Sequence, residues 1–187
     1  MKLKKWNAAL ALLSILAMLV HIGYSVFAYL TFYYNPALKL ITAIPFMVLV
    51  CLHAVCGMLT VFLQADGTRL AQYPGKNRQT LIQRVSAALI FPLLILHLNT
   101  FSLLQSTAES GQWGFFALLI LAEIAFFGVV IAHVAVSFSK ALITLGILSS
   151  AKAQKRLDLV MYILGAAVFV CAVVSVVKGQ AAMFIHL

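Results

Sequence analysis

Five long apolar runs take up most of this 187-residue chain. A helix needs roughly 20 apolar residues to cross about 30 Å of hydrocarbon, whereas a strand of a membrane barrel needs about half that number. Because the runs are continuous and long, they exclude strands and predict an all-α integral membrane protein with five transmembrane helices. The predicted spans are residues 7–30, 39–64, 80–104, 114–139 and 158–178, with ends placed to within about 2–4 residues.

Composition supports the same class. Hydrophobic residues make up 64% of the chain and charged residues only 9%, and the mean hydropathy is +1.08. These values lie far outside the range of soluble domains, so residues 1–187 are expected to form a single transmembrane domain. No room remains in them for a soluble catalytic domain. Any substrate must therefore be handled by a partner protein, or be lipid-soluble like a quinone.

Short polar links with turn-forming residues separate the first four predicted spans. They contain Asn35–Pro36, then Asp66–Gly67 with Pro74–Gly75, then Glu109–Ser110–Gly111. The fourth link, residues 149–156, is basic and favours helix, so the fourth helix is expected to extend past the bilayer. The run after Lys5 is too long for a signal peptide and predicts a retained first helix. The three cysteines lie within spans without a metal or heme-attachment spacing, which indicates packing residues.

Basic residues predict the orientation, because Lys and Arg collect in cytoplasmic loops. With the N-terminus in the cytoplasm and the C-terminus outside, eleven of the thirteen basic residues fall on the inner side: Lys2, Lys4, Lys5, Arg69, Lys76, Arg78, Arg84, Lys140, Lys152, Lys155 and Arg156. Only Lys39 and Lys178 fall on the outer side. The net charge of +9 therefore reflects topology and contact with anionic lipid, and it gives no indication of nucleic-acid binding.

One histidine lies in each of the first four spans: His21, His53, His97 and His133. Ionisable groups in hydrocarbon are costly and usually functional, and imidazole is an axial ligand of heme iron. At 1.5 Å per residue, His21 and His97 lie about 14 and 10 Å from the outer end, and His53 and His133 about 21 and 28 Å. The sequence thus predicts two bis-histidine hemes, roughly 10–15 Å apart along the membrane normal, one on His21 and His97 and the other on His53 and His133.

These motifs resemble the diheme cytochrome b membrane subunit of succinate:quinone oxidoreductases and quinol:fumarate reductases, over nearly the whole chain. Gln83–Arg84–Val85–Ser86 with His97 is similar to the family's QRxTG...H segment, and His53 to Gly57 to its HxxxG segment. His133 with Lys140–Ala141–Leu142 and Leu145–Gly146 resembles the fourth, ligand-bearing helix. Ala87 and Ser137 stand where the family has glycines, but such small residues still allow close approach of a porphyrin.

The resemblance implies the same pairing: a proximal heme b on His53 and His133 and a distal heme b on His21 and His97. It implies location in the inner (cytoplasmic) membrane and two partner subunits, a flavoprotein holding FAD and a protein holding iron-sulfur clusters. The dicarboxylate chemistry would belong to those partners. This chain would anchor them, within a complex able to dimerise, and would exchange electrons with a quinone, menaquinone being the expected one.

Four further residues are candidates for supporting roles. Arg84 and Lys140 are predicted at the inner surface, where each would either pair with a heme propionate or anchor its helix by snorkelling. Ser86 would donate a hydrogen bond to heme or to backbone. Glu123, the acidic residue in the interior of the fourth span, is the candidate for quinone-coupled proton transfer, although it could equally bond a neighbouring hydroxyl.

Two other readings stay open on the sequence alone. The chain could be the diheme quinone-reactive subunit of another respiratory enzyme, such as a hydrogenase, formate dehydrogenase or nitrate reductase. It could also be a heme-free small transporter or structural membrane protein, in which the histidines relay protons or bond between helices. The direction of the reaction, the quinone and its site do not follow from the sequence. His186 is expected to be an ordinary polar residue at the terminus.

Overall fold

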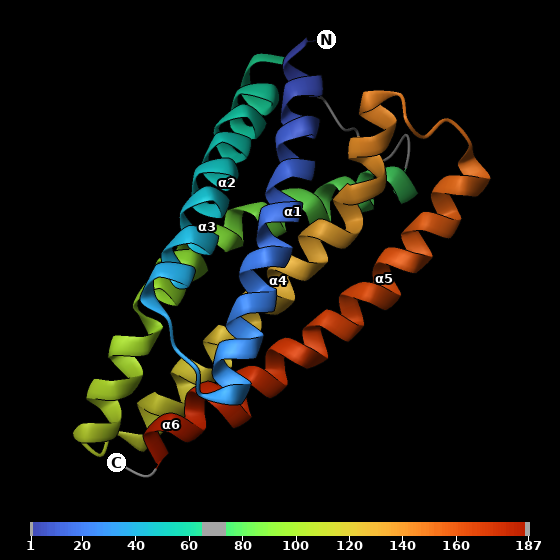
Figure 1. The fold of residues 1–187 in the computed structure, drawn as a ribbon. Coiled ribbons are helices and arrows are strands. Elements are labelled where there is room, and N and C mark those ends of the chain that lie inside the picture. The colour runs from blue at the N-terminus through green and yellow to red at the C-terminus, as the bar shows by residue number, and fades with distance from the viewer. Residues whose placement is uncertain (1, 65–73, 186–187) are drawn as a thin grey trace.

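The computed structural model describes residues 2–64 and 74–185, and every regular element within these ranges is helical (Figure 1). The elements are α1 (Lys2–Thr31), α2 (Pro36–Gln64), α3 (Pro74–Glu109), α4 (Trp113–Leu145), α5 (Ala151–Val174), a π-helical segment η1 (Ser175–Ala181) and the short α6 (Ala182–Ile185). Five stretches of the described chain are long and apolar enough to cross a membrane. The prediction of a multi-pass, all-helical membrane protein is confirmed.

The helix ends differ from the predicted spans in two places. Pro74–Gly75 was predicted as a turn, but α3 begins at Pro74, because proline suits the first helical position, where its missing N–H is not needed. The fourth helix does extend beyond residue 139, but it ends at Leu145, and residues 151–156 open α5 instead. Gly146 causes this break by adopting a left-handed φ of 80°. Asp66–Gly67, Arg69 and His186 lie outside the described residues.

The turn between α1 and α2 is held by side chains. Asn35 caps α2, since its Oδ1 accepts hydrogen bonds from the backbone N–H groups of Ala37 at 3.0 Å and Leu38 at 3.2 Å. The Tyr24 hydroxyl donates to the Asn35 carbonyl at 2.8 Å and accepts from the Asn35 N–H at 2.9 Å. Tyr24 therefore connects the body of α1 to the start of α2.

The helices pack as two antiparallel pairs, α1 with α2 and α3 with α4. The pairs meet through α1 and α4, and α5 packs on α4 with lesser contact to α1. The two termini lie at opposite ends of the bundle (Figure 1). None of the residues of α2 whose side chains are described is fully buried, so this helix is covered mainly by α1 and otherwise faces lipid or the interior of the bundle. Each helix pair carries two of the four histidines: His21 and His53 lie on α1 and α2, and His97 and His133 lie on α3 and α4.

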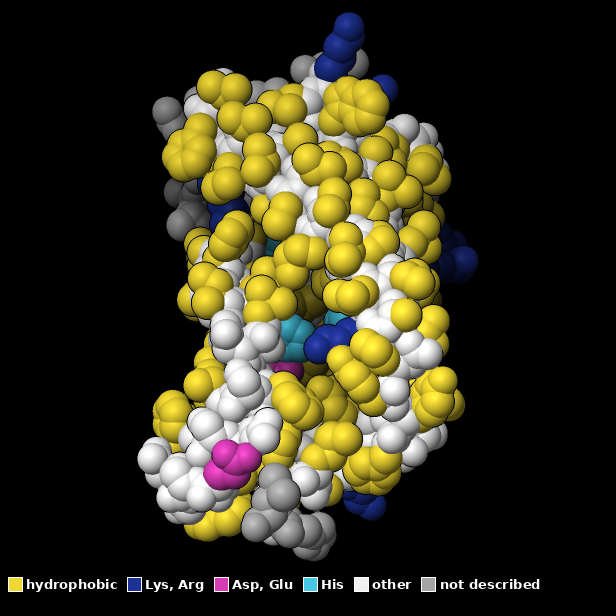
Figure 2. Space-filling view, turned by 60° about the vertical axis from the view of Figure 1, so that its left-hand side comes forward, with side chains coloured by type: hydrophobic (Ala, Val, Ile, Leu, Met, Phe, Trp, Pro, Cys, Tyr) yellow, Lys and Arg dark blue, Asp and Glu magenta, His cyan; other side chains and the backbone are white. Residues whose placement is uncertain are grey.

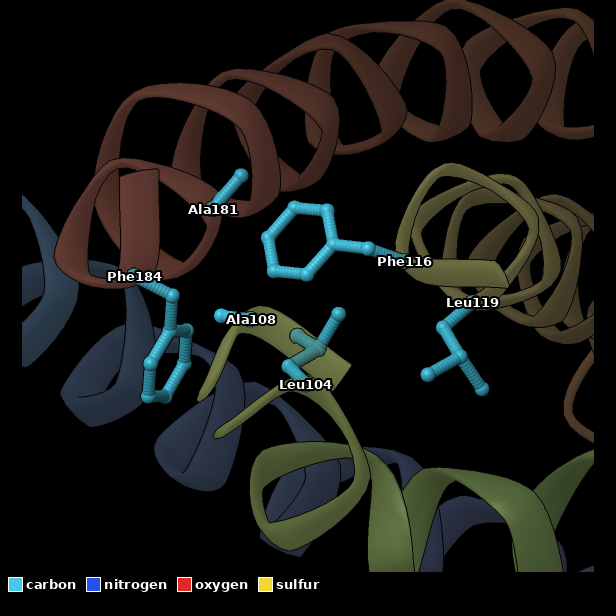
Figure 3. Close-up of a cluster of buried hydrophobic side chains, with 6 residues drawn as sticks. All are labelled: Leu104, Ala108, Phe116, Leu119, Ala181 and Phe184. Carbon is cyan, nitrogen blue, oxygen red and sulfur yellow. The ribbon is translucent and has the colours of Figure 1, made fainter. Parts of the chain in front are cut away.

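A compact apolar core lies at the end of the bundle where α3, α4, η1 and α6 meet (Figure 3). Its members are fully or almost fully buried: Leu104, Ala108, Phe116, Leu119, Ala181 and Phe184. Leu96 and Leu103 pack against it from α3. Burial of each such large side chain contributes about 1.5–3 kcal/mol where water is the alternative, and within lipid the tight packing itself holds the helices together. This core fixes α3 relative to α4 next to His97.

Most of the remaining surface is apolar, as Figure 2 shows for one face. Leucine, isoleucine, valine and phenylalanine side chains are exposed along all five long helices. Such a continuous apolar surface is unstable in water and suits hydrocarbon. In the same view histidine side chains are visible in an opening between the helices, beside a basic side chain and an acidic one.

Candidate functional site

The structure brings the rings of His53 on α2 and His133 on α4 together in an edge-to-face arrangement; we call them the inner pair. Their ring centroids are 6.5 Å apart and the ring planes are inclined by 62°. A metal–imidazole bond is about 2 Å long and the ring nitrogen lies about 1 Å from the ring centre, so two imidazoles on opposite sides of one ion have centroids about 6 Å apart. The spacing of the inner pair therefore fits two axial ligands of one metal ion.

The hydrogen bonds of the inner pair leave the correct nitrogen free for a metal. His53 Nδ1 donates to the Asn7 carbonyl at 3.2 Å, and His133 Nδ1 donates to the Gln83 carbonyl at 3.1 Å. Because a carbonyl oxygen can only accept, these two contacts favour the tautomer with the proton on Nδ1, which leaves Nε2 with its lone pair. Metal-binding histidines characteristically donate their second N–H to a carbonyl or carboxylate in this way.

Ser86 belongs to the surroundings of the inner pair. It is buried, its Oγ lies 3.0 Å from His133 Nδ1, and the hydroxyl is 2.7 Å from the Ile82 carbonyl and 3.0 Å from the Gln83 carbonyl. The expected hydrogen bond from Ser86 to backbone is confirmed. Its hydroxyl supports the ring of His133 and the first turns of α3. A hydrogen bond from Ser86 to heme stays a prediction.

Lys140 lies close to the inner pair and Arg84 on the adjoining helix. Lys140 Nζ donates to the Gln83 side-chain oxygen at 3.3 Å and to Thr80 Oγ1 at 3.4 Å. Gln83 thus contacts both His133 and Lys140, through its carbonyl and its side chain. Arg84 is half-buried on α3 and has an interaction partner of its own. Pairing of either cation with a heme propionate stays a prediction.

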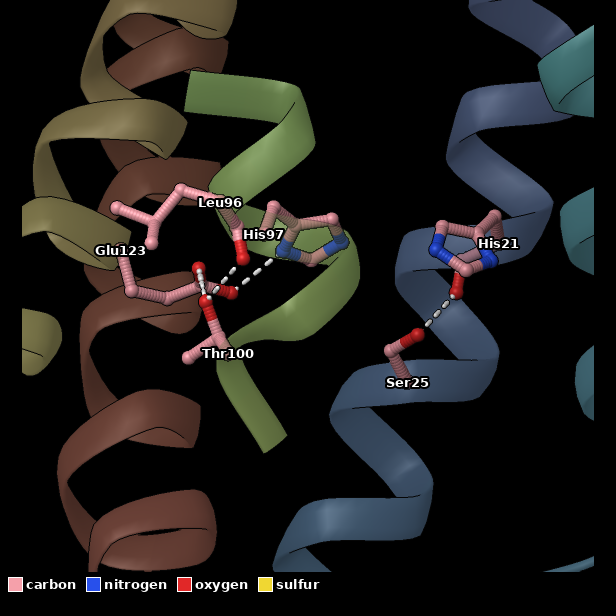
Figure 4. A network of polar contacts seen from close by, with 6 residues as sticks. All are labelled: His21, Ser25, Leu96, His97, Thr100 and Glu123. Atoms are coloured by element: carbon pink, nitrogen blue, oxygen red, sulfur yellow. Dashed lines mark hydrogen bonds and ion pairs between the residues drawn. The ribbon is translucent and has the colours of Figure 1, made fainter. Parts of the chain in front are cut away.

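His21 on α1 and His97 on α3 form the outer pair. Figure 4 shows the His97 ring pointing away from α4 toward α1, where His21 lies at the same level of the bundle. His97 stacks on Phe126, with ring centroids 4.8 Å apart, and His21 stacks on Phe46 with centroids 5.7 Å apart. Both rings are thus held by an aromatic side chain of the neighbouring helix. The two helices that carry them belong to different helix pairs, as for the inner pair.

Glu123 is the partner of His97. The side chain of Glu123 is almost completely buried, its Oε1 accepts from His97 Nδ1 at 2.6 Å, and Thr100 Oγ1 lies 3.1 Å from its Oε2 (Figure 4). The alternative of a bond to a neighbouring hydroxyl is thereby confirmed for Thr100. The main contact, however, is the carboxylate–imidazole bond, which sequence reasoning missed. A role of Glu123 in proton transfer is not tested by these contacts and stays a prediction.

His21 differs from the other three histidines. Its Nδ1 is buried and has no hydrogen-bond partner among the described residues. The nearby Ser25 hydroxyl donates instead to the His21 backbone carbonyl, at 2.9 Å. Buried polar atoms without a partner are uncommon in folded proteins. The unpaired nitrogen distinguishes His21 from His53, His97 and His133, whose Nδ1 atoms each have a partner.

Within the described residues no three His, Cys, Asp or Glu side chains gather to hold a metal ion directly. The histidines occur as pairs instead, and a pair supplies only two ligands. A porphyrin supplies four equatorial nitrogens itself, so two opposed imidazoles are all that a six-coordinate heme iron needs from protein. Two imidazoles at each site would match the number of protein ligands that such a heme takes.

Sequence reasoning assigned no contact with the histidines to three residues: Thr100, Gln83 and Asn7. Thr100 follows His97 by three residues and so lies on the same helical face, which is a signal that could have been used. Gln83 and Asn7 contact the histidines through their backbone carbonyls, and no pattern of side chains in the sequence predicts such contacts.

Comparison of the chain with protein-family models, curated proteins and solved structures found no match.

Proposed function

We propose that this chain is the diheme cytochrome b membrane anchor of a succinate dehydrogenase or fumarate reductase complex. In this function it passes electrons between membrane quinone and an iron-sulfur and a flavoprotein subunit. The observation that carries the proposal is the inner pair: two neighbouring imidazoles on different helices, with centroids 6.5 Å apart and each Nδ1 beside a backbone carbonyl. The motifs around His53, Gln83 and His133, and the five spanning helices, support the assignment to this family.

The residues around the two histidine pairs have different roles in this proposal. His53 and His133 would hold one heme b and His21 and His97 the other. When bound, each heme supplies a one-electron ferric–ferrous couple. Asn7, Gln83 and Ser86 orient the inner imidazoles, and Glu123 orients His97. The apolar helices surround both pairs, and Lys140 and Arg84 place positive charge near the inner pair, where heme propionates would need it.

The arrangement of the pairs supports a route across the bilayer. The outer pair joins α1 to α3, and the inner pair joins α2 to α4. The two sites would therefore lie one after the other along the length of the bundle, between the two helix pairs. The excess of basic residues at the end that carries Lys140 favours the cytoplasmic side for the inner pair and hence for the soluble partners. Quinone, a lipid-soluble substrate, would exchange electrons with the bundle from within the membrane.

Gentle purification of the native complex tests this function. The chain is expected to copurify with a flavoprotein that holds FAD covalently and with an iron-sulfur protein. Its reduced-minus-oxidised spectrum should show b-type heme that a menaquinol analogue reduces. Copurification instead with a hydrogenase, formate dehydrogenase or nitrate reductase would contradict the succinate–fumarate assignment. It would not contradict the binding of heme. An intact protein without heme would contradict the whole proposal and favour a transporter or a structural protein.

A further inference from the structure

The two histidine pairs differ in the charge of the group that their Nδ1 atoms meet. In the inner pair both Nδ1 atoms donate to neutral backbone carbonyls, at 3.2 and 3.1 Å. In the outer pair His97 donates to the Glu123 carboxylate at 2.6 Å, and His21 Nδ1 has no partner among the described residues. The pairs are thus alike in ligand type but unlike in electrostatics. Hydrogen bonds to the ligands of a metal change its reduction potential although the bonded groups do not touch the metal.

Glu123 is held rigidly in this position. It is 2% exposed, and both of its oxygens are engaged, one by His97 and one near the Thr100 hydroxyl. Thr100 is 1% exposed and sits one turn from Leu104 of the apolar core, so α3 cannot move away from α4 here without disrupting that core. A buried carboxylate without a hydrogen-bonded partner would be costly, which favours persistence of its contact with His97.

We propose that Glu123 is a positioning residue that orients the His97 imidazole and lowers the midpoint potential of the heme that His97 would hold. The inference rests on the proposed function, since it requires heme on both pairs. A negative charge bonded to an axial imidazole stabilises ferric iron, which carries one more positive charge than ferrous iron, and so disfavours reduction. The carbonyls of Asn7 and Gln83 are neutral and exert this effect far less.

The Glu123→Gln variant tests the proposal in a redox titration of the purified heme-loaded protein, followed by absorbance. Glutamine keeps a carbonyl oxygen that can accept from His97 Nδ1 and removes the charge. The reduction equilibrium of one heme is expected to shift about tenfold toward the reduced form, which is about 59 mV for a one-electron couple, and the second heme should not change. Glu109→Gln is the matched control, because Glu109 is exposed on the same bundle, and it should leave both potentials unchanged.

The Thr100→Val variant gives an independent result of opposite sign. It keeps the carboxylate but removes the hydroxyl beside Oε2, so the charge acts more strongly on His97 and the outer potential should fall. Two bound hemes with unchanged potentials in both variants would overturn the proposal while leaving the proposed function intact. Should Glu123→Gln lose heme, the titration of Thr100→Val decides alone. Wild-type protein without heme would instead overturn the proposed function.

Discussion

Replacement of His133 by alanine is expected to remove one of two hemes and to leave the other bound. His53→Ala should remove the same heme, because both imidazoles are needed on opposite sides of one iron and their centroids lie only 6.5 Å apart. His21→Ala and His97→Ala should each remove the second heme. The measurement is the reduced-minus-oxidised spectrum of each purified variant, with heme quantified per chain.

Double replacements make the pairing testable without reliance on spectral assignment. Residues that act as one unit are not additive, so His53→Ala with His133→Ala should cost no more heme than either change alone. A double replacement across the pairs, such as His53→Ala with His97→Ala, should remove both hemes. Ile143→Ala, at an exposed position on the same helix as His133, serves as a control and should retain both. Loss of all heme in every single variant, with the fold intact, would contradict two independent sites.

Replacement of Gly179 by alanine is expected to destabilise the protein by about 1–3 kcal/mol, with a lower temperature of thermal unfolding in detergent. A Cβ at this position would lie 2.6 Å from Tyr29 Cβ and 2.9 Å from the Tyr29 carbonyl oxygen. The second contact involves backbone, so no change of side-chain rotamer relieves it. Gly179 lies in η1, where the chain widens into a π-helix against α1.

Gly23→Ala is the matched control for this change. Gly23 lies within α1, and nothing is within 4 Å of a Cβ built there. Alanine favours helix over glycine by up to about 1 kcal/mol, so unfolding should occur at the same or a slightly higher temperature. Equal unfolding temperatures for Gly179→Ala and wild type would show that α1 and η1 do not pack closely in the folded protein.

The number and type of the helices could be predicted because lipid imposes a simple rule. A chain that must satisfy its own backbone groups in hydrocarbon becomes helical wherever an apolar run is long enough. The helix ends were less predictable, because they depend on local effects. Pro74 starts a helix instead of a turn, and Gly146 ends α4 before the basic residues that seemed to continue it.

The proximity of His53 and His133 was predictable from the sequence, and the partners of the histidine rings were not. Counting residues along each helix paired His53 with His133, and the structure places these rings together. The partners of the rings depend on how α1, α3 and α4 rotate against one another, which side-chain spacing alone does not give. Two contacts could not be predicted for this reason: the one between His53 and the Asn7 carbonyl and the one between His97 and Glu123.

Quantification of heme per copy of the purified chain tests this account most directly. The protein should be expressed in a heme-replete host, and the hemes should be measured as their pyridine complexes against the protein concentration from amino-acid analysis. Two b-type hemes per chain is the predicted result, since the four histidines supply ligands for two irons. A helical, monodisperse protein that contains no heme would contradict it, and the histidines would then serve proton transfer or helix packing.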